Sequence, residues 1–467
     1  MLIPSLLGRI LRETPALSCA YLVGGCVRDA LLGIPVKDYD IEVFNITFDV
    51  LIHQLGRWGR VDLVGKSFGV IKLQTDSKTL YEFSLPRKDS KVAAGHKGFE
   101  ISVDPQLSLK AACSRRDFTI NSMLYDPRKD CLIDFFNGEN DLRNRVLRHV
   151  SDAFIEDPLR VLRGMQFASR FNLEFAPETV ALCRSIAHLY GELSKERIRE
   201  EWFKWAGLSV KPSVGLRFLE ATQWIQHYPE LSILVKIPQD IQWHPEGNVF
   251  IHTCHACDAL AAIPHWQEAS SELRIVTLLA TLTHDFGKPL TTETVMRDGV
   301  SRIISFCHDE AGMMPAAQFL ERIGCPISII QKVLPLVRNH LAHLNEPSIR
   351  NIRRLAKKLY PASINELCMI MAADHCGRPP LKCDPPIRVN KMLEIAKEMH
   401  LENTAPEPLI KGRHLMKFGI PPGPIYSRIL SAAYEFQIEG QYETLDEGLA
   451  WLKTYLLQQK INFQNNP

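Results

Sequence analysis

The spacing of apolar residues changes near residue 146, and this change restricts the folds that the chain can adopt. Before it, short apolar runs such as 20–23 and 39–44 alternate with turn signals and short helical segments, as in α/β or α+β modules. After it, segments such as 158–170 and 194–205 carry apolar residues at helical spacing, and almost nothing alternates like a strand. We therefore expect an α+β protein, with a small mixed sheet and helices in the head and only helices after it.

The composition is typical of a soluble globular protein. Hydrophobic residues make up 46% of the chain and charged residues 23%, and no apolar run approaches the ~18 residues that span a bilayer. The N-terminal segment lacks a signal-peptide layout and predicts an amphipathic helix. The 12 cysteines are scattered along the chain and only Cys254 and Cys257 have CxxC spacing, a pattern that predicts reduced thiols in a cytoplasm and no disulfide framework. Because the net charge is only +2, any nucleic-acid surface must be local.

Segment 86–115 is one such local basic region. Glycines and an excess of cations over carboxylates predict a mobile loop there that contacts phosphates. Its cations, with the residue after it, are Arg87, Lys88, Lys91, Lys97, Lys110, Arg115 and Arg116. A second irregular segment, 376–386, holds four prolines and predicts a linker or a rigid turn.

The strongest chemical signal is a glycine pair followed by two aspartates. Gly24 and Gly25 lie between an expected strand and a helix, where glycine lets backbone N–H groups approach a phosphate. Asp38 and Asp40 are two apart on the next strand and therefore face the same side. Two carboxylates on one face favour a bound cation, and Glu82 on a later strand is a candidate third carboxylate. The pattern predicts a two-metal Mg²⁺ site for in-line displacement at a triphosphate.

Residues 22–44 resemble the class II tRNA nucleotidyltransferases, which are CCA-adding enzymes, and the related bacterial poly(A) polymerases. The family signature, Gly-Gly-x-Val-Arg-Asp followed by Asp-x-Asp, is matched from Gly24 through Asp40. Further motifs that resemble the family follow in order: an Arg-Arg-Asp segment at 114–121, a hinge motif at 134–141, a templating motif at 156–160 and a neck motif at 196–204. The resemblance implies template-independent transfer of CMP and AMP from CTP and ATP to the 3′ end of tRNA.

The resemblance also implies which residues bind the nucleotide. They are Gly25, Arg28, Arg116, Asp117, Asn121, Asp157, Arg160 and Arg163. Asp157 and Arg160 are three apart, so on a helix they would share a face and match the edge of C or A. The alternative is an ordinary helix ion pair worth ~0.2–0.5 kcal/mol. Gln166 stands where the family usually has arginine, which leaves the choice between CCA and A-only addition open.

A second candidate site lies in the histidine-rich part of the chain. His284 and Asp285 end an apolar segment that Gly287 terminates, and an imidazole beside a carboxylate is a corner for a divalent metal. His252 and Asp374 are expected to complete the ligand set. The alternative is a hydrogen-bonded pair at a helix end.

The order His252, His284-Asp285, Asp374 resembles the HD phosphohydrolase superfamily, and 243–312 resembles the HD domain fused to some CCA-adding enzymes. The resemblance implies metal-dependent hydrolysis of 2′,3′-cyclic phosphates, 2′-nucleotides and phosphomonoesters, with Ni²⁺ and Mn²⁺ as candidate ions and Lys288 as a phosphate ligand. The remaining histidines His308, His340 and His343 are candidates for a second metal, for phosphate binding or for plain surface positions.

Together these features predict a multifunctional enzyme of four parts. They are the nucleotidyltransferase head 1–145, a helical neck 146–225, an HD domain 226–400 and a helical tail 401–467. We expect a cytoplasmic monomer or homodimer that binds tRNA, CTP and ATP and no membrane. The alternatives are a poly(A) polymerase or A-only enzyme of the same family, and a non-catalytic RNA-binding protein, which the intact aspartates disfavour.

Overall fold

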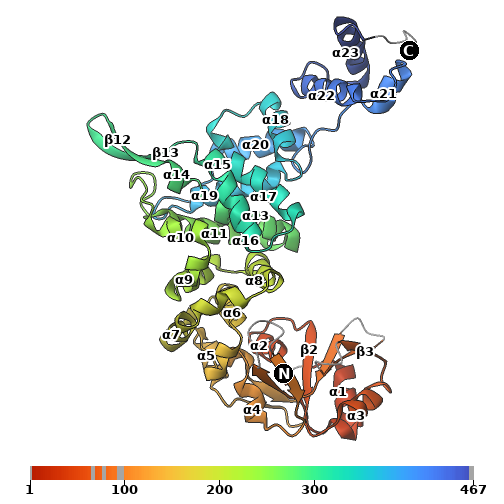
Figure 1. Cartoon of the computed structure of the whole chain (residues 1–467), viewed down its shortest axis with the longest axis vertical. Coiled ribbons are helices and arrows are strands. Elements are labelled where there is room, and N and C mark those ends of the chain that lie inside the picture. Colours follow the sequence, from red (N-terminus) through yellow and green to blue (C-terminus); the bar gives the residue numbers. More distant parts are fainter. Residues whose placement is uncertain (1–2, 65–68, 76–79, 92–98, 462–467) are drawn as a thin grey trace. The chain divides into compact units, whose positions relative to one another are not determined.

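A computed structural model describes residues 3–64, 69–75, 80–91 and 99–461. Many of its elements are labelled in Figure 1. The chain divides into two compact units, Met1–Tyr228 and Pro229–Pro467. The predicted α+β fold, with a small mixed sheet in the head and helices after it, is confirmed.

The first unit is built around a seven-stranded mixed sheet, in the order β3-β4-β5-β2-β1-β8-β9. Its strands are β1 (Ala20–Val23), β2 (Asp38–Val43), β3 (Arg60–Val64), β4 (Val70–Gln74), β5 (Leu80–Ser84), β8 (Leu124–Asp126) and β9 (Cys131–Ile133). β2 and β5 pair in parallel, whereas the other neighbouring strands are antiparallel. The parallel register sets Asp40 opposite Glu82, so the sheet itself brings two candidate carboxylates together.

Short helices accompany this sheet. They are α1 (Ser5–Glu13), α2 (Gly25–Leu31), α3 (Phe48–Leu55), α4 (Leu109–Ser114) and α5 (Gly138–Arg143). The amphipathic helix predicted at the N-terminus is α1, which buries Leu7, Ile10 and Leu11. Gly24 has a φ of 70°, a backbone conformation that costs glycine little, and this lets the chain turn sharply from β1 into α2.

The prediction of a mobile loop at 86–115 is wrong for the described part of that segment. β6 (Arg87–Lys91) and β7 (Phe99–Val103) form an antiparallel ribbon, and α4 follows with Ser108 as its N-cap. The many charges of the segment hid an alternating pattern in 99–103, where every second residue is apolar. The predicted phosphate contact of Lys97 lies outside the described residues.

Four helices follow the head within the first unit. They are α6 (Leu159–Phe171), α7 (Pro177–Ser185), α8 (Lys195–Leu208) and α9 (Pro212–Ala221), beside the short parallel pair β10 (Val146–Leu147) and β11 (Glu174–Phe175). α6 packs against both α8 and α9, over buried Trp202 and Trp205. A Cβ on Gly215 would lie 2.3 Å from Ser169 Oγ, so α9 approaches α6 as closely as glycine allows.

The second unit is a helical bundle followed by a small helical tail. Its helices are α10 (Pro229–Ser232), α11 (Val249–Ala261), α12 (Pro264–Gln267), α13 (Ser271–Thr283), α14 (Lys288–Thr291), α15 (His308–Ala311), α16 (Met313–Arg322), α17 (Ile327–Asn339), α18 (Ile349–Leu359), α19 (Ile364–Cys376), α20 (Ile387–Glu398), α21 (Gly412–Lys417), α22 (Ile425–Ile438) and α23 (Leu445–Gln458). α11, α13 and α19 pack against one another. Asn248 caps the start of α11, and Ser363 with Glu366 forms a capping box on α19.

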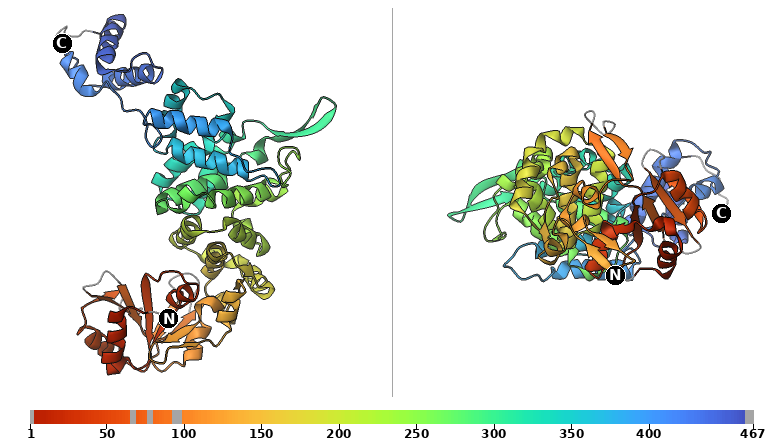
Figure 2. Two further views of the ribbon diagram at one scale, coloured as in Figure 1. Left: turned by 180° about the vertical axis from the view of Figure 1, so that it is seen from behind. Right: turned by 90° about the horizontal axis from the view of Figure 1, so that it is seen from below.

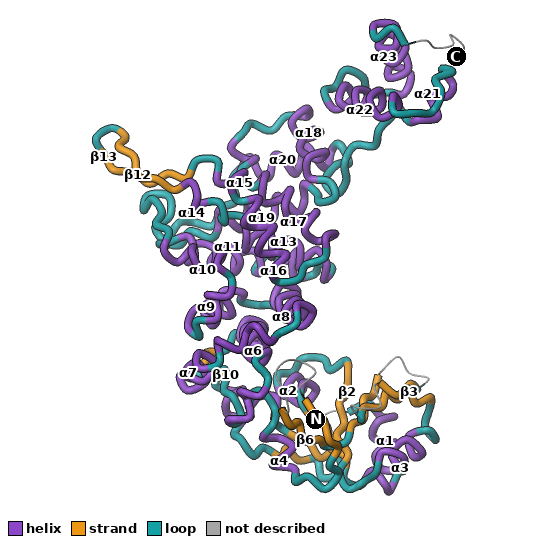
Figure 3. Tube along the Cα trace, viewed as in Figure 1, coloured by secondary structure: helices purple, strands orange, loops and turns teal. Residues whose placement is uncertain are grey.

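A β-hairpin, which was not predicted from the sequence, projects from this bundle. β12 (Thr292–Arg297) and β13 (Val300–Ser305) pair antiparallel, and Figures 2 and 3 show them extending away from the helices. The turn is Asp298-Gly299, with φ values of 50° and 76°. Asp-Gly is a strong signal for a tight hairpin turn, and it was the available clue.

Two further findings concern the cysteines and membranes. Cys376 and Cys383 form a disulfide, so the prediction of wholly reduced thiols is wrong at this pair. The pair closes the proline-containing segment that was predicted as a linker or turn, although its spacing does not match the CxxC pattern that was sought. Among the described residues, every helix is too short or too polar to span a bilayer.

Candidate active sites

The head brings together the three carboxylates predicted for catalysis. Asp38 and Asp40 lie on the accessible face of β2, because residues two apart on a strand point the same way. Glu82 lies opposite Asp40 on β5, and its Oε1 is 2.8 Å from Lys72 Nζ. Three carboxylates on neighbouring strands repel one another, and an all-oxygen ligand set suits Mg²⁺. The donor set therefore fits the expected metal.

A fourth carboxylate, Glu42, was not predicted from the sequence. It lies two residues beyond Asp40 on β2 and is fully buried. Its Oε1 is 3.1 Å from Arg115 Nη2, and its Oε2 is 3.2 Å from Arg116 Nη2. Its position, two residues beyond Asp40, was the signal available in the sequence.

Arg116 lies close to the glycine pair. A Cβ on Gly24 would be 3.1 Å from Arg116 Nη1 and 4.0 Å from Asp40 Oδ2. Glycine thus leaves room for a guanidinium beside the carboxylates. Gly25 and Arg116, which were predicted to bind the nucleotide, therefore lie near Asp40.

Arg28, another predicted nucleotide ligand, is buried. Its guanidinium donates to Asn121 Oδ1 at 2.6 Å and to Asp29 Oδ1 at 2.6 Å. It also lies 4.5 Å from the ring centre of Phe171 and 5.2 Å from that of Phe167, both on α6. Arg28 therefore joins α2 to α6 by hydrogen bonds and cation–π contacts.

Asp117, Asn121 and Arg163 form one network. Asp117 Oδ2 accepts from Arg163 Nε at 2.7 Å, and Asp117 Oδ1 accepts from Asn121 Nδ2 at 3.1 Å. Burial alone would raise the pKa of Asp117, but Arg163 and the hydrogen bonds from Asn121 and the Phe118 N–H lower it. The carboxylate is therefore held ionised.

The structure corrects the predicted placement of the templating pair. Asp157 precedes α6 in an extended conformation, because Pro158 disfavours helical geometry in the residue before it. Asp157 Oδ2 accepts from Arg197 Nη2 at 2.7 Å, while Arg160 donates to the carbonyls of Ala153 and Arg115, each at 2.7 Å. Asp157 and Arg160 therefore do not share a helix face. The Arg160 N–H donates to the Asp157 carbonyl at 3.0 Å, while their side chains contact the other groups named above.

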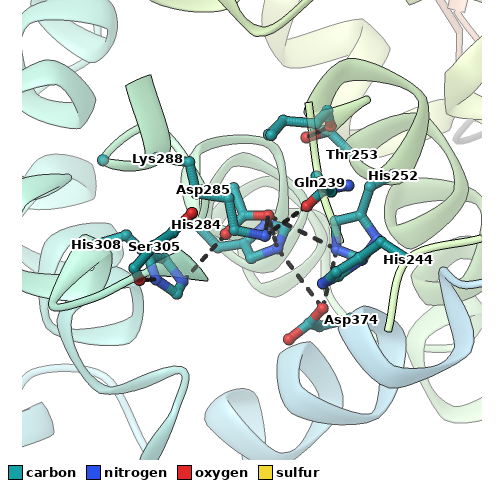
Figure 4. Close-up of polar contacts among 12 residues, drawn as sticks. Gln239, His244, His252, Thr253, His284, Asp285, Lys288, Ser305, His308 and Asp374 are labelled. Atoms are coloured by element: carbon teal, nitrogen blue, oxygen red, sulfur yellow. Dashed lines mark hydrogen bonds and ion pairs between the residues drawn. The ribbon is translucent and has the colours of Figure 1, made fainter. Parts of the chain in front are cut away.

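The second unit gathers the four residues predicted as HD ligands (Figure 4). His252 Nε2 is 2.9 Å from Asp374 Oδ1, and His284 Nε2 is 3.3 Å from Asp285 Oδ2. His252 Nε2 is also 3.7 Å from Asp285 Oδ2. α11, α13 and α19, with the residues that end α13, deliver these groups, so three packed helices define the site.

The histidines are oriented so that their Nε2 atoms face one centre. His284 Nδ1 lies 2.7 Å from the Thr281 carbonyl, and His252 Nδ1 lies 2.8 Å from Glu246 Oε1. Oxygen partners require Nδ1 to be the protonated nitrogen, which turns Nε2 toward the carboxylates. Burial opposes protonation of His252, but the hydrogen bonds that it donates to Asp374 and Glu246 raise its pKa to about 9. Without a metal its Nε2 therefore also carries a proton, which a bound metal would displace. Imidazole and carboxylate donors at this spacing fit a divalent transition metal.

A second cluster adjoins the first. His308 Nε2 is 3.3 Å from Asp285 Oδ1 and 3.2 Å from His340 Nε2. His308 and His340 each direct Nδ1 at a backbone carbonyl, at 2.7 Å. Burial and the neighbouring His284 and His308 lower the pKa of His340 to about 3, so this imidazole is neutral. Asp285 therefore offers one oxygen to each cluster.

Buried polar side chains brace both clusters. Glu246 Oε1 accepts from His244 as well as His252, and burial is outweighed by these hydrogen bonds, which lower the pKa of Glu246 to about 2. Lys288 Nζ lies 2.6 Å from Asp285 Oδ2 and donates to Gln239 Oε1 at 2.8 Å. Lys288 is thus a counter-charge to Asp285 beside the site.

Comparisons with known proteins agree with this geometry. Residues 20–148 match the family model of the poly A polymerase head domain. The chain is 34% identical to a "Multifunctional CCA protein" of Xylella fastidiosa over 372 residues, which cover 77% of this chain and 84% of that protein. It is also 34% identical to a protein of that name from Vibrio vulnificus, over 78% of this chain and 87% of that one.

Solved structures show the same fold. The CCA-adding enzyme of Bacillus stearothermophilus, in complex with CTP, has a TM-score of 0.63 at 20% identity, over 98% of this chain and 99% of that chain. The Thermotoga maritima CCA-adding enzyme complexed with tRNA has a TM-score of 0.56, also at 20% identity, over 97% of this chain and 94% of that one. The fold and the head site define a nucleotidyltransferase of the poly(A) polymerase head class. The chain belongs to the family of multifunctional CCA proteins.

The pKa of Asp40 makes a prediction for the metal-free protein. Desolvation and the nearby Glu82 raise this pKa to about 6, so the folded chain holds the proton more tightly than the unfolded chain. Ionising Asp40 between pH ~4 and ~6 therefore costs stability, and the cost is constant above that range. With EDTA present, Asp40→Asn should melt at a higher temperature than the parent chain at pH 8 and at a similar one near pH 4. Equal melting temperatures at pH 8 would contradict this account.

Proposed function

We propose that the chain completes and repairs the 3′ ends of tRNA by adding CMP and AMP from CTP and ATP. The observation that carries this proposal is the set of Asp38, Asp40 and Glu82 on two parallel strands of the matched head. Support for the substrates comes from the related CCA-adding enzymes, one with CTP, one with ATP and one with tRNA.

The roles proposed for the head follow from the contacts. Asp38 and Asp40 hold Mg²⁺, which when bound would orient the attacking hydroxyl and the triphosphate. Arg116 and the backbone at Gly25 bind the triphosphate. The network of Asp117, Asn121 and Arg163 supports the sugar and phosphates, and Arg28 holds α2 against α6.

Base selection is assigned to Asp157 and Arg160. Because each now contacts another group, base binding must replace one of those hydrogen bonds or use remaining donor and acceptor positions. This exchange suits a site that must select first C and then A. Gln166 is buried in α6, and its Oε1 has no hydrogen-bond partner among the described residues. Because glutamine is uncharged, it does not provide the positive charge that an arginine would supply at this position.

The proposal includes the division into head 1–145, neck 146–225, HD domain 226–400 and tail 401–467, and a cytoplasmic monomer or homodimer. A poly(A) polymerase or an A-only enzyme is the second candidate. Purified protein should be incubated with tRNA that ends before CCA, with tRNA that ends in CC and with an unrelated RNA, each with single nucleotides. Addition of C and then A to tRNA alone supports the first candidate, and long A tracts on any RNA support the second.

Removing one head carboxylate tests the catalytic assignment. Asp38→Ala should lower CTP and ATP incorporation into truncated tRNA by at least about a thousandfold, because the metal would lose a ligand. Incorporation is measured with labelled nucleotides. Near-normal incorporation by the variant would refute the assignment of the head site.

We propose a second activity, metal-dependent phosphoester hydrolysis, for the cluster of His252, His284, Asp285 and Asp374. Candidate substrates are 2′,3′-cyclic phosphates, 2′-nucleotides and phosphomonoesters, and candidate ions are Ni²⁺ and Mn²⁺. The bound metal would supply a nucleophilic water at neutral pH. Lys288 would hold a phosphate oxygen. The proposal is supported by the convergent Nε2 atoms and by the carboxylates that they face.

The two activities should be separable. Asp285→Ala should abolish hydrolysis of 2′,3′-cyclic AMP and of p-nitrophenyl phosphate in Ni²⁺ or Mn²⁺, while nucleotide incorporation into tRNA stays within about twofold of the parent. Asp38→Ala is the matched control, with the opposite pattern. Loss of both activities in either folded variant would mean that the two sites are not independent.

The adjoining cluster extends this proposal to a second ion, which Asp285, His308 and His340 would hold. In a chain that also carries Asp38→Ala, His340→Ala should bind about one Mn²⁺ fewer per chain, since it removes one of three ligands. The metal content is measured after equilibrium dialysis. His343→Ala is the control, because His343 lies one turn away and contacts the His340 carbonyl. An unchanged metal content in His340→Ala would exclude the second ion.

A further inference from the structure

Glu42 is a buried charge to which the proposed reaction assigns no role. It lies on β2, on the same strand face as Asp38 and Asp40, against the Arg-Arg-Asp segment, and its side chain is 1% exposed. An isolated carboxylate in such a place would be strongly unfavourable. Its burial is explained by two arginines, and it is these arginines that connect it to function.

Each oxygen of Glu42 holds a different arginine. Oε1 accepts from Arg115 Nη2 and Oε2 from Arg116 Nη2, at 3.1 and 3.2 Å. Both guanidinium groups are mostly buried, with side chains 20% and 19% exposed. Buried arginines would repel each other without the shared carboxylate, so Glu42 fixes the separation as well as the direction of both.

Arg116 links Glu42 to the proposed triphosphate site. Its Nη1 lies beside the position that a Cβ of Gly24 would occupy, at the start of α2. Its Nε is buried and has no acceptor among the described residues. A guanidinium that is anchored through one nitrogen and retains free donors is suited to bind an anion.

Arg115 carries the constraint toward the templating region. Its carbonyl accepts from Arg160 Nη2 at 2.7 Å, and the neighbouring Ser114 carbonyl accepts from Ser151 Oγ at 2.6 Å. Arg160 is the proposed base-selecting arginine. The position of its guanidinium therefore depends on the backbone at Arg115, whose side chain Glu42 holds.

We propose that Glu42 is a positioning residue that couples triphosphate binding to base selection. Through Arg116 it sets the site of the triphosphate, and through Arg115 it sets the place of Arg160. Substitution of Glu42 therefore weakens binding of CTP and ATP and relaxes discrimination against UTP and GTP. This inference rests on the proposed nucleotide addition and extends it.

The test is steady-state incorporation into truncated tRNA with each of the four nucleotides. Glu42→Gln keeps the size of the side chain and removes the charge. We expect the KM for CTP and ATP to rise about tenfold, kcat to fall less than about threefold, and the preference for CTP over UTP to fall about tenfold. A merely structural residue would not change the preference between nucleotides.

Two further variants make the result specific. Asp126→Asn removes a comparably buried carboxylate on β8 of the same sheet, which lies 3.3 Å from Arg128 Nε. It should change melting temperature without changing nucleotide preference. Glu42→Asp retains the charge on a shorter side chain and should give intermediate values. If Glu42→Gln does not fold, Glu42→Asp provides the test of nucleotide preference.

The outcomes separate this inference from the proposed function. If Glu42→Gln keeps KM and nucleotide preference within about twofold of the parent, or changes only what Asp126→Asn changes, the inference is overturned. If the parent chain adds no nucleotide, or Asp38→Ala remains active, the proposed function fails and the inference fails with it.

Discussion

Repulsion between like charges governs the structure around both candidate centres. In the head, Asp38 and Asp40 share a strand face, and the adjacent Glu42 and Glu82 are balanced by arginines and a lysine. In the second unit, Lys288 lies against Asp285. These counter-charges offset part of the negative charge at each centre, and the remaining groups that face one another are those that a cation would bring together.

The parts of each site that depend on short sequence spacing could be predicted. A two-residue interval on a strand places Asp38 and Asp40 on one face, and the glycine before α2 follows from the turn that β1 requires. His284 and Asp285 follow an apolar helix and precede a glycine, which locates them at a helix end. In these cases local geometry decides the placement, and the sequence contains it.

Features that depend on distant partners could not be predicted in this way. Glu42 forms ion pairs with two arginines of a segment more than 70 residues away, and Asp157 pairs with Arg197 on α8. The hairpin β12–β13 was missed because helical spacing on both sides outweighed a single Asp-Gly turn. The disulfide between Cys376 and Cys383 has a spacing that by itself matches no established pairing pattern.

The parallel pairing of β2 with β5 has a consequence for how this family can vary. Parallel neighbours require a crossover, and here the chain between them also builds α3, β3 and β4, with β3 at the edge of the sheet. β4 lies next to β5 and carries Lys72 against Glu82, whereas β3 is one strand further from the carboxylates. A change of length at β3 should therefore disturb the register of Asp40 against Glu82 least, which makes this edge of the sheet the natural place to graft a tag or a foreign loop.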